Sequence, residues 1–214
     1  MADYILFDFD GTIFDTGEGV MKCMQYGLSK IGIEAELSEL RCFMGPPLTD
    51  MMKLRYGLSG EVADKVLDYY RERYAPIGWQ ECYPFAGMPE LIKKLKAAGK
   101  KLAVATSKPI VYTEKILRKY DMYDDFDLVC GCELDGTRSK KWEVIDYAIE
   151  QFGIAPEQAI MIGDRKYDFI GAAKCGVKCI GVRFGYAEEG ELEAEGAEFI
   201  AEDTEELYRY LINS

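Results

Sequence analysis

The strongest constraint on the fold is a regular alternation of strand-like and helix-like segments after residue 84. Short apolar runs bounded by turn-forming residues recur between stretches whose apolar residues have helical spacing. Because each strand is followed by a helix, we expect parallel strands in one sheet with helices on both of its faces. The strands are predicted at residues 102–107, 126–131, 158–163, 177–182 and 197–201.

A further strand is predicted at residues 4–7, and it leads directly into Asp8, Phe9 and Asp10. In an extended backbone Asp8 and Asp10 project to the same side. Two carboxylates about 4 Å apart repel each other by about 4 kcal/mol at an effective dielectric constant of about 20. The pair therefore needs a nearby cation, or one of the two must hold a proton.

The strand pattern is interrupted between residues 17 and 83, where the apolar residues have helical spacing. Val20, Met24 and Leu28 mark one such face. We therefore expect an α/β fold with a Rossmann-like parallel sheet in residues 1–14 and 86–214. A small helical-bundle cap domain is expected as an insertion at residues 15–85.

Ligands of parallel α/β sheets bind at the carboxyl ends of the strands. Thr106 and Ser107 end one predicted strand, and Asp164 follows another, with Asp168 one helical turn later. Lys140 and Lys141 open a predicted helix. Taken one at a time, the Thr106–Ser107 pair is explained more simply as a helix cap, and the two lysines as surface residues.

The composition excludes several classes of function. The chain has no histidine, so Ser–His and Cys–His nucleophile systems are excluded. Its seven cysteines form no CxxC pair, which argues against zinc and is typical of a reducing cytoplasm. The net charge of −12 disfavours nucleic acid and anionic membranes as partners. We interpret the acidic run at residues 187–199 as a solvated surface.

No apolar run is long enough to span a membrane, and the N-terminal segment lacks the pattern of a signal peptide. Both observations favour a cytoplasmic location.

The acidic residues at the strand ends favour a hard cation, since no histidine or paired cysteine accompanies them. We expect Mg²⁺ there, bound by Asp8, Asp164 and the main-chain carbonyl of Asp10. Asp8 is the candidate nucleophile toward phosphorus, and Asp10 is the candidate general acid and base.

In combination, these residues resemble the four motifs of the haloacid dehalogenase-like phosphatase superfamily. The segment DFDGT (residues 8–12) resembles the first motif, Thr106 the second, Lys141 the third and GDRKYD (residues 163–168) the fourth. The segments FMGPPL (43–48) and ATSKP (105–109) resemble the phosphoglycolate phosphatase-like group most closely. The likeness covers the whole chain and includes the helical insertion.

The resemblance implies roles for individual residues. The implied catalytic residues are Asp8, Asp10, Thr106 and Lys141, and the implied phosphate contacts are Gly11, Thr106, Ser107 and Lys141. The implied metal ligands are Asp8, Asp10 and Asp164, with Asp168 supporting them from outside. Lys141 is preferred to Lys140, although Trp142 follows it where many relatives have proline. The cap residues proposed to set specificity are Arg41, Met44, Gly45 and Pro46.

The implied activity is Mg²⁺-dependent hydrolysis of a phosphomonoester through an aspartyl-phosphate. The expected partner is a small phosphorylated metabolite, with a phosphoglycolate-like compound first and a nucleoside 5′-monophosphate or sugar phosphate as alternatives. A phosphomutase, a phosphonatase that uses Lys22 or Lys53, and a non-catalytic binding protein are the other classes. We expect a monomer or a homodimer.

Overall fold

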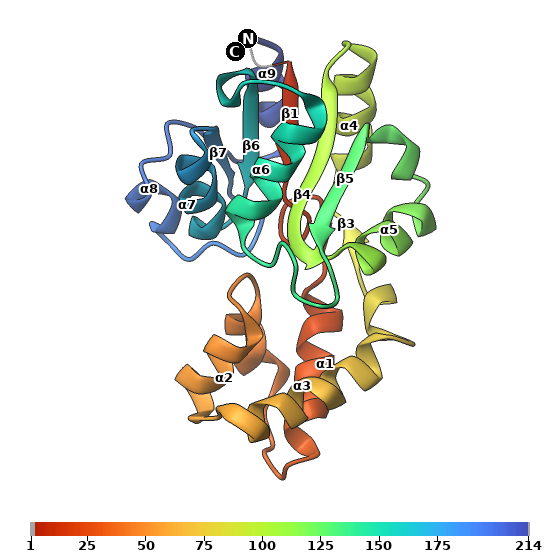
Figure 1. Ribbon diagram of the computed structural model, residues 1–214, viewed down its shortest axis with the longest axis vertical. Coiled ribbons are helices and arrows are strands. Elements are labelled where there is room, and N and C mark those ends of the chain that lie inside the picture. The colour runs from red at the N-terminus through yellow and green to blue at the C-terminus, as the bar shows by residue number, and fades with distance from the viewer. Residues whose placement is uncertain (1–2, 214) are drawn as a thin grey trace. The chain divides into compact units, whose positions relative to one another are not determined.

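The structure, a computed structural model, describes residues 3–213 and contains one large parallel sheet (Figure 1). Its six strands have the order β5-β4-β1-β6-β7-β8, and all neighbours run parallel. The expected Rossmann-like parallel sheet is therefore confirmed. The strands are β1 (Tyr4–Phe7), β4 (Lys101–Pro109), β5 (Leu128–Cys132), β6 (Ala159–Gly163), β7 (Lys178–Val182) and β8 (Ile200–Ala201).

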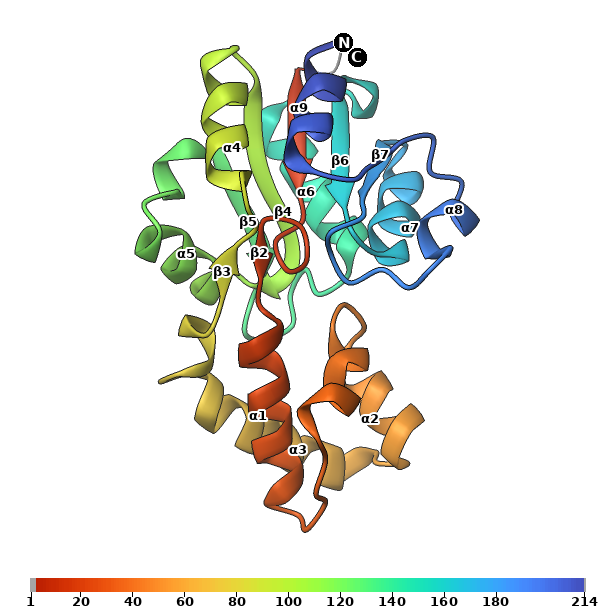
Figure 2. The same ribbon diagram turned by 180° about the vertical axis from the view of Figure 1, so that it is seen from behind.

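Helices cover both faces of this sheet, as the two opposite views show (Figures 1 and 2). One face carries α6 (Lys141–Phe152) and α7 (Lys166–Cys175), and the other carries α4 (Met88–Ala97) and α9 (Thr204–Asn213). The remaining helices of the core are α5 (Ile110–Lys119), α8 (Glu191–Ala194) and the short 3₁₀ helices η3 (Tyr123–Asp125) and η4 (Pro156–Gln158).

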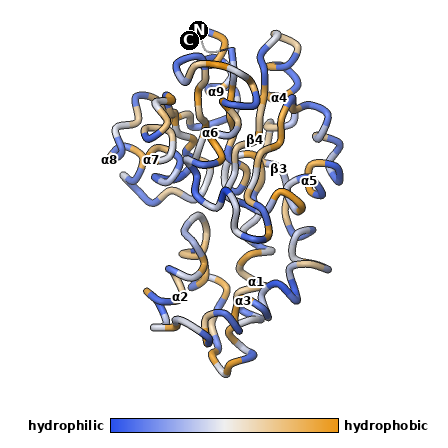
Figure 3. The backbone as a smooth tube through the Cα atoms, in the orientation of Figure 1, coloured by the Kyte–Doolittle hydropathy of each residue, from blue (hydrophilic) through white to orange (hydrophobic). Residues whose placement is uncertain are grey.

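The central strands are apolar along their length because both of their faces are buried. Leu6 on β1 and Met161 on β6 are fully buried and pack with Val144 and Ala148 of α6. Figure 3 shows hydrophobic residues along β4 and hydrophilic ones around α8. Among the described residues, no helix is both long and apolar enough to cross a membrane.

A second compact unit, the helical unit, comprises residues 15–83. Helix α1 (Gly17–Ser29) packs against α3 (Gly60–Tyr74) at Gly27, where a Cβ would lie 2.7 Å from the main-chain oxygen of Val66. The close approach of the two helices thus requires glycine at this position. The elements are α1 (Gly17–Ser29), η1 (Leu37–Phe43), α2 (Leu48–Tyr56), α3 (Gly60–Tyr74) and η2 (Gly78–Gln80).

The core unit is formed by residues 1–14 and 84–214, so the chain leaves it once and re-enters it once. Two short strands, β2 (Phe14–Asp15) and β3 (Tyr83–Pro84), pair with each other at these points. The expected cap at residues 15–85 ends two residues later than the helical unit. Residues 1, 2 and 214 of the expected core lie outside the described residues.

Candidate active site

Three neighbouring strands end at one edge of the core sheet and bring polar residues there (Figure 1). Asp8 directly follows β1, Thr106 lies near the end of β4, and Asp164 directly follows β6. The pairing of β1 with both neighbours extends to its last residue, Phe7. Each of the three polar residues is at most 8% exposed. The predicted site residues of the three strands are thus gathered at one buried edge.

Lys141, at the first position of α6, reaches into this group of residues. Its Nζ lies 2.5 Å from Asp8 Oδ1 and 3.0 Å from Asp168 Oδ1, and it donates to the main-chain oxygen of Ala105 at 3.3 Å. Lys140 is exposed at the N-cap of the same helix. Of the two candidate lysines, the structure therefore places Lys141 beside the candidate nucleophile.

Asp168 lies in the first turn of α7 and uses its two oxygens differently. Oδ2 accepts a hydrogen bond from the Arg165 N–H at 3.1 Å and so caps the helix, while Oδ1 faces Lys141. A Cβ on Gly163 would lie 2.2 Å from the Asp168 carboxyl carbon, so this carboxylate packs directly against the end of β6. Asp168 thus lies inside the acidic group, whereas the sequence interpretation placed it outside.

The carboxylates of Asp8, Asp164 and Asp168 offer oxygens that all lie within 4.8 Å of one another, and all three residues are buried. Within the described part of the chain, Asp8 Oδ1 and Asp168 Oδ1 are buried without a well-aligned hydrogen bond, although Lys141 is in ion-pair range of both. Three carboxylates and one ammonium leave two formal negative charges. This group fits a hard divalent cation bound by oxygen ligands.

The electrostatics of the site agree with this interpretation. Burial raises the pKa of Asp8 to about 6; the Lys141 ammonium limits the rise, and Asp168 adds to it. Burial also raises the pKa of Asp164 well above its ordinary value, and Asp168 and Asp8 add to that shift. For Lys141, burial disfavours the ammonium, but Asp168 and Asp8 more than offset this effect and the pKa is raised. A cation at the carboxylates would restore their ionised form.

Asp10 has a different partner. Its carboxylate lies beside the Nζ of Lys108, at 3.0 Å and 3.2 Å from the two oxygens. It is not among the three carboxylates that converge on one point. Any contribution of Asp10 to metal binding therefore rests on its main-chain carbonyl, as the sequence interpretation proposed. Lys108 itself was missed, because its position on β4 was not considered a site position.

The candidate phosphate contacts differ from one another in burial and in hydrogen bonding. Thr106 is buried, and its Oγ accepts a hydrogen bond from the Lys108 N–H at 3.2 Å, which leaves the hydroxyl proton available. Ser107 is exposed. Gly11 has a φ of +86°, and its N–H already donates to the Phe14 oxygen at 2.9 Å. The structure thus gives the Gly11 amide a partner within its own loop.

Residues far along the chain brace the metal-ligand candidates, and the sequence interpretation did not find them. The Tyr186 N–H donates to Asp164 Oδ2 at 2.7 Å. Glu191 Oε1 accepts from Arg165 Nε and from the Lys166 N–H, both at 2.8 Å. The prediction that residues 187–199 form a solvated surface is therefore wrong at Glu191, whose side chain is 8% exposed. An ion pair with Arg165 offsets the cost of burying this carboxylate.

The candidate specificity residues all lie in the helical unit. Arg41 and Gly45 are exposed and Pro46 is half-buried, whereas Met44 is buried. Gly45 has a φ of +98°, which accounts for glycine at this turn. Because they are exposed, Arg41 and Gly45 are available for contacts. Met44 is buried and therefore packs inside this unit.

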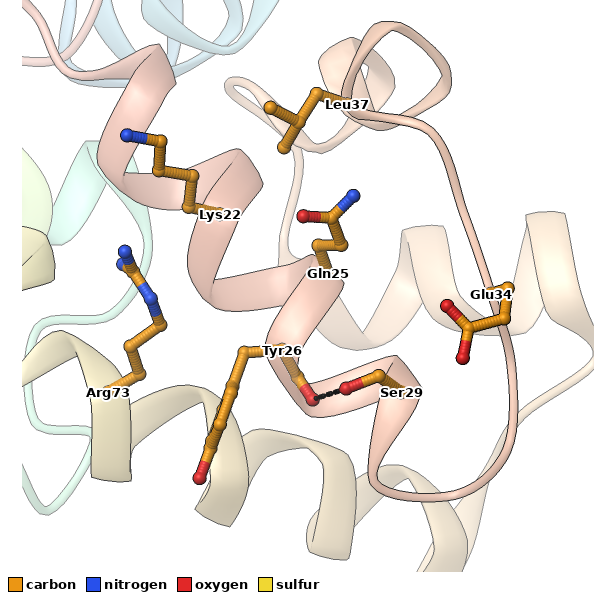
Figure 4. Close-up of a pocket in the computed structure, with 7 residues that line it drawn as sticks. All are labelled: Lys22, Gln25, Tyr26, Ser29, Glu34, Leu37 and Arg73. Carbon is orange, nitrogen blue, oxygen red and sulfur yellow. Dashed lines mark hydrogen bonds between the residues drawn. The ribbon is translucent and has the colours of Figure 1, made fainter.

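The helical unit also has a pocket of about 550 Å³, lined on one side by residues from α1 (Figure 4). Lys22 from α1 and Arg73 from α3 extend into the same space, and both form ion pairs with Glu81. Lys22 donates hydrogen bonds to Glu18 and Glu81, and these bonds raise its pKa. A Schiff-base lysine requires the opposite shift. The other lining residues are Gln25, Tyr26, Ser29, Glu34 and Leu37.

Comparisons with known proteins give one family model and several relatives. A family model described as haloacid dehalogenase-like hydrolase matches residues 5–182. The 5′-nucleotidase of Pseudomonas aeruginosa is 42% identical over 191 residues, which cover 89% of this chain and 86% of that protein. Tyrosine-protein kinase PtkA of Mycobacterium tuberculosis is 34% identical over 183 residues, which cover 85% of this chain and 62% of that protein.

A solved structure extends the likeness to the full length. The crystal structure of a predicted phosphatase from Clostridium acetobutylicum matches with a TM-score of 0.95 at 40% sequence identity, and the match covers 100% of both chains. The likeness therefore includes the core and the helical unit alike.

Proposed function

We propose that this chain, which belongs to the haloacid dehalogenase-like hydrolase family, is a Mg²⁺-dependent phosphatase that forms an aspartyl-phosphate on Asp8. The observation that carries the proposal is the buried group of Asp8, Asp164 and Asp168 with the Lys141 ammonium 2.5 Å from Asp8. Mg²⁺ bound to these carboxylates would supply positive charge against the phosphate oxygens.

The chain's own residues account for the two chemical steps. In the first step an oxygen of Asp8 attacks phosphorus, the bond to the ester oxygen breaks, and Asp10 gives a proton to that leaving oxygen. In the second step water attacks phosphorus and Asp10 takes its proton, which frees Asp8 and inorganic phosphate. Lys141 offsets negative charge beside Asp8, and the Thr106 hydroxyl donates to a phosphoryl oxygen.

We place nucleoside 5′-monophosphates first among the substrates, because the Pseudomonas relative at 42% identity is named a 5′-nucleotidase. Phosphoglycolate and sugar phosphates, of which the sequence interpretation preferred the first, become the alternatives. Arg41 and Gly45 are the proposed cap residues for this choice, since their exposure leaves them available.

The remaining classes are less compatible with the site. A phosphonatase needs a lysine with a lowered pKa, and the pKa of Lys22 is raised by Glu18 and Glu81. The sugar-phosphate mutases of the superfamily use a cap histidine near the hinge, and the sequence has none. A non-catalytic binding protein has no need for Asp8, Lys141 and Asp164 together at one buried edge.

The test measures release of inorganic phosphate from p-nitrophenyl phosphate and from a panel of nucleoside monophosphates, phosphoglycolate and sugar phosphates. We expect activity with Mg²⁺ that EDTA removes and that Asp8→Asn lowers by at least about 10³-fold, since the nucleophile is lost. Asp127→Asn is the matched control, because Asp127 pairs with Lys101 elsewhere in the core. Wild-type turnover by Asp8→Asn, or phosphate release unaffected by EDTA, would contradict the proposal.

A further inference from the structure

Lys108 is a buried lysine for which the proposed chemical steps provide no role. It lies on β4, and its side chain is 5% exposed. Burying an ammonium is costly unless a carboxylate or several hydrogen-bond acceptors compensate for the lost water. Here its Nζ lies 3.0 Å and 3.2 Å from the two oxygens of Asp10. The lysine therefore contacts the candidate general base through both of its carboxylate oxygens.

The main chain of Lys108 contacts a second candidate catalytic residue. Its N–H donates to Thr106 Oγ at 3.2 Å. The pairing of β4 with β5 changes register between Ala105 and Pro109, so this contact forms where the strand is irregular. Irregular strand positions commonly redirect side chains next to active sites. One residue thus contacts the hydroxyl proposed to bind the phosphoryl group and the carboxylate proposed to move protons.

We propose that Lys108 is a positioning residue that holds the Asp10 carboxylate where it can take a proton from the hydrolytic water. In that step a water oxygen forms a bond to phosphorus and its proton passes to Asp10. The bond between phosphorus and Asp8 breaks, and its electron pair returns to the Asp8 carboxylate as phosphate leaves. The inference rests on the proposed function, because it assigns Lys108 to the second step of that reaction.

The geometry favours this role over a purely structural one. An ammonium that faces both carboxylate oxygens restricts rotation of the carboxyl group, which a single contact would not do. Asp10 is 25% exposed at its side chain, so it retains access to water, whereas Lys108 lies deeper. A general base must be held within hydrogen-bond reach of the proton that it takes.

The test uses p-nitrophenyl phosphate, because its leaving group needs no proton and the first step then does not depend on Asp10. Lys108→Met should slow the second step, so kcat and KM fall together by about 10- to 100-fold while kcat/KM changes less than about threefold. A rapid burst of nitrophenolate of about one equivalent per active site should appear as the aspartyl-phosphate accumulates. A purely structural role would lower kcat/KM and give no burst.

The matched control is Lys101→Met. Lys101 lies on the same strand and also pairs with an aspartate, Asp127, but it is exposed and lies at the opposite end of the strand. We expect wild-type kinetics for it. Lys108→Arg keeps the positive charge and should restore most of kcat, whereas Lys108→Gln, which is polar and similar in length, should behave like Lys108→Met. If Lys108→Met does not fold, Lys108→Gln tests the same role of Lys108.

A double-mutant cycle separates an effect through Asp10 from an independent effect. In the Asp10→Asn background, adding Lys108→Met should change kcat by less than about twofold, because the residue that it positions is already lost. Additive losses would overturn the inference. If Asp8→Asn keeps wild-type turnover, the proposed function fails; if Asp8→Asn is inactive but Lys108→Met and Lys108→Gln match Lys101→Met, only the role of Lys108 fails.

Discussion

Gly11 and Asp164 approach each other so closely that a Cβ on Gly11 would lie 2.1 Å from Asp164 Oδ2. Gly185 packs against the same side chain, where its Cβ would lie 2.3 Å from the Cβ of Asp164. The Tyr186 N–H holds Oδ2 at 2.7 Å. The position of this carboxylate is therefore set by backbone segments from two distant parts of the chain.

Gly11→Ala should disturb the site directly, because the new methyl group must displace Asp164 and because φ is +86° at this position. We expect the free energy of unfolding to fall by about 2 kcal/mol or more and phosphatase activity to be largely lost. Gly99→Ala is the control, since Gly99 has a similar φ of +84° but no described atom within 4 Å of its Cβ position. It should cost about 1 kcal/mol and keep activity.

Denaturant unfolding and phosphate release measure the two effects of these alanine variants separately. A loss of stability by Gly11→Ala equal to that of Gly99→Ala, with activity retained, would show that the contact with Asp164 is unimportant.

Much of the site was predictable because the carboxyl ends of parallel strands meet at one edge. Asp8 and Asp164 directly follow strands and Thr106 lies near the end of one, so local pattern and sheet geometry suffice to bring them together. The family resemblance, which the comparisons confirm, favoured Lys141 over Lys140. The order of the strands in the sheet was not predicted, since it depends on packing between segments far apart in the sequence.

The missed residues act through contacts that no local pattern reveals. Glu191 and Tyr186 lie about 20 residues after the motif that they brace. Glu191 belongs to the run at residues 187–199, whose composition indicated only a solvated surface, and Tyr186 lies just before that run. Lys108 lies two positions after Thr106 and one position beyond the predicted strand at residues 102–107. It was missed because β4 continues to Pro109, through an irregularity in its pairing with β5 that local sequence does not indicate.

Mg²⁺ should stabilise the protein more at pH 7.5 than at pH 5. Burial raises the pKa of Asp8 to about 6, so in the metal-free folded protein this carboxyl holds a proton at pH 5 more often than in the unfolded chain. The stability that this proton on Asp8 gives the metal-free protein is present below about pH 4, and it is lost as the pH rises through about 6. Metal binding must displace that proton at pH 5 but not at pH 7.5.

Thermal unfolding with and without Mg²⁺ at each pH measures this difference directly. At Mg²⁺ concentrations near 100 times Kd the stabilisation at pH 7.5 should approach about 2.7 kcal/mol. Asp164→Asn should reduce it at both pH values, because one ligand is lost. Equal stabilisation at pH 5 and pH 7.5, or an undiminished effect in Asp164→Asn, would contradict the assignment of the site.

Glu191→Gln should weaken Mg²⁺ binding although Glu191 is not a metal ligand. Its carboxylate holds Arg165 and the Lys166 N–H at the start of α7, between Asp164 and Asp168. Loss of its charge removes the ion pair with the buried Arg165 guanidinium and should cost about 1–3 kcal/mol. We expect the Mg²⁺ concentration for half-maximal thermal stabilisation to rise several-fold.

Glu193→Gln is the control for this effect, since Glu193 lies two residues later on α8 and forms an exposed ion pair with Arg183. It should leave both the stability and the Mg²⁺ titration nearly unchanged, because exposed ion pairs contribute little. Identical titrations for the two variants would mean that Glu191 does not position the ligands.

Glu81→Gln should destabilise the helical unit and make its stability depend less on pH in the acidic range. Glu81 accepts two hydrogen bonds from Arg73, at 2.7 Å and 3.0 Å, and one from Lys22 at 3.2 Å. The hydrogen bonds from Arg73 lower the pKa of Glu81; burial opposes this effect and Lys22 supports it. The ion pair therefore stabilises the folded state above the unfolded pKa of about 4.5, and this contribution is lost as pH falls through the lower folded value.

We expect Glu81→Gln to lower the free energy of unfolding by about 1 kcal/mol at pH 7. Its effect should be smaller at pH 3, because the contribution of the ion pair decreases as the pH falls below the unfolded pKa of about 4.5. Hydrogen exchange of the intact protein should show faster exchange in α1 and α3, the helices that carry Lys22 and Arg73. Asp68→Asn, which removes an exposed ion pair with Arg71 on α3, is the control and should change neither measurement. An equal loss of stability at pH 3 and pH 7 would show that the charge of Glu81 is not the source of its contribution.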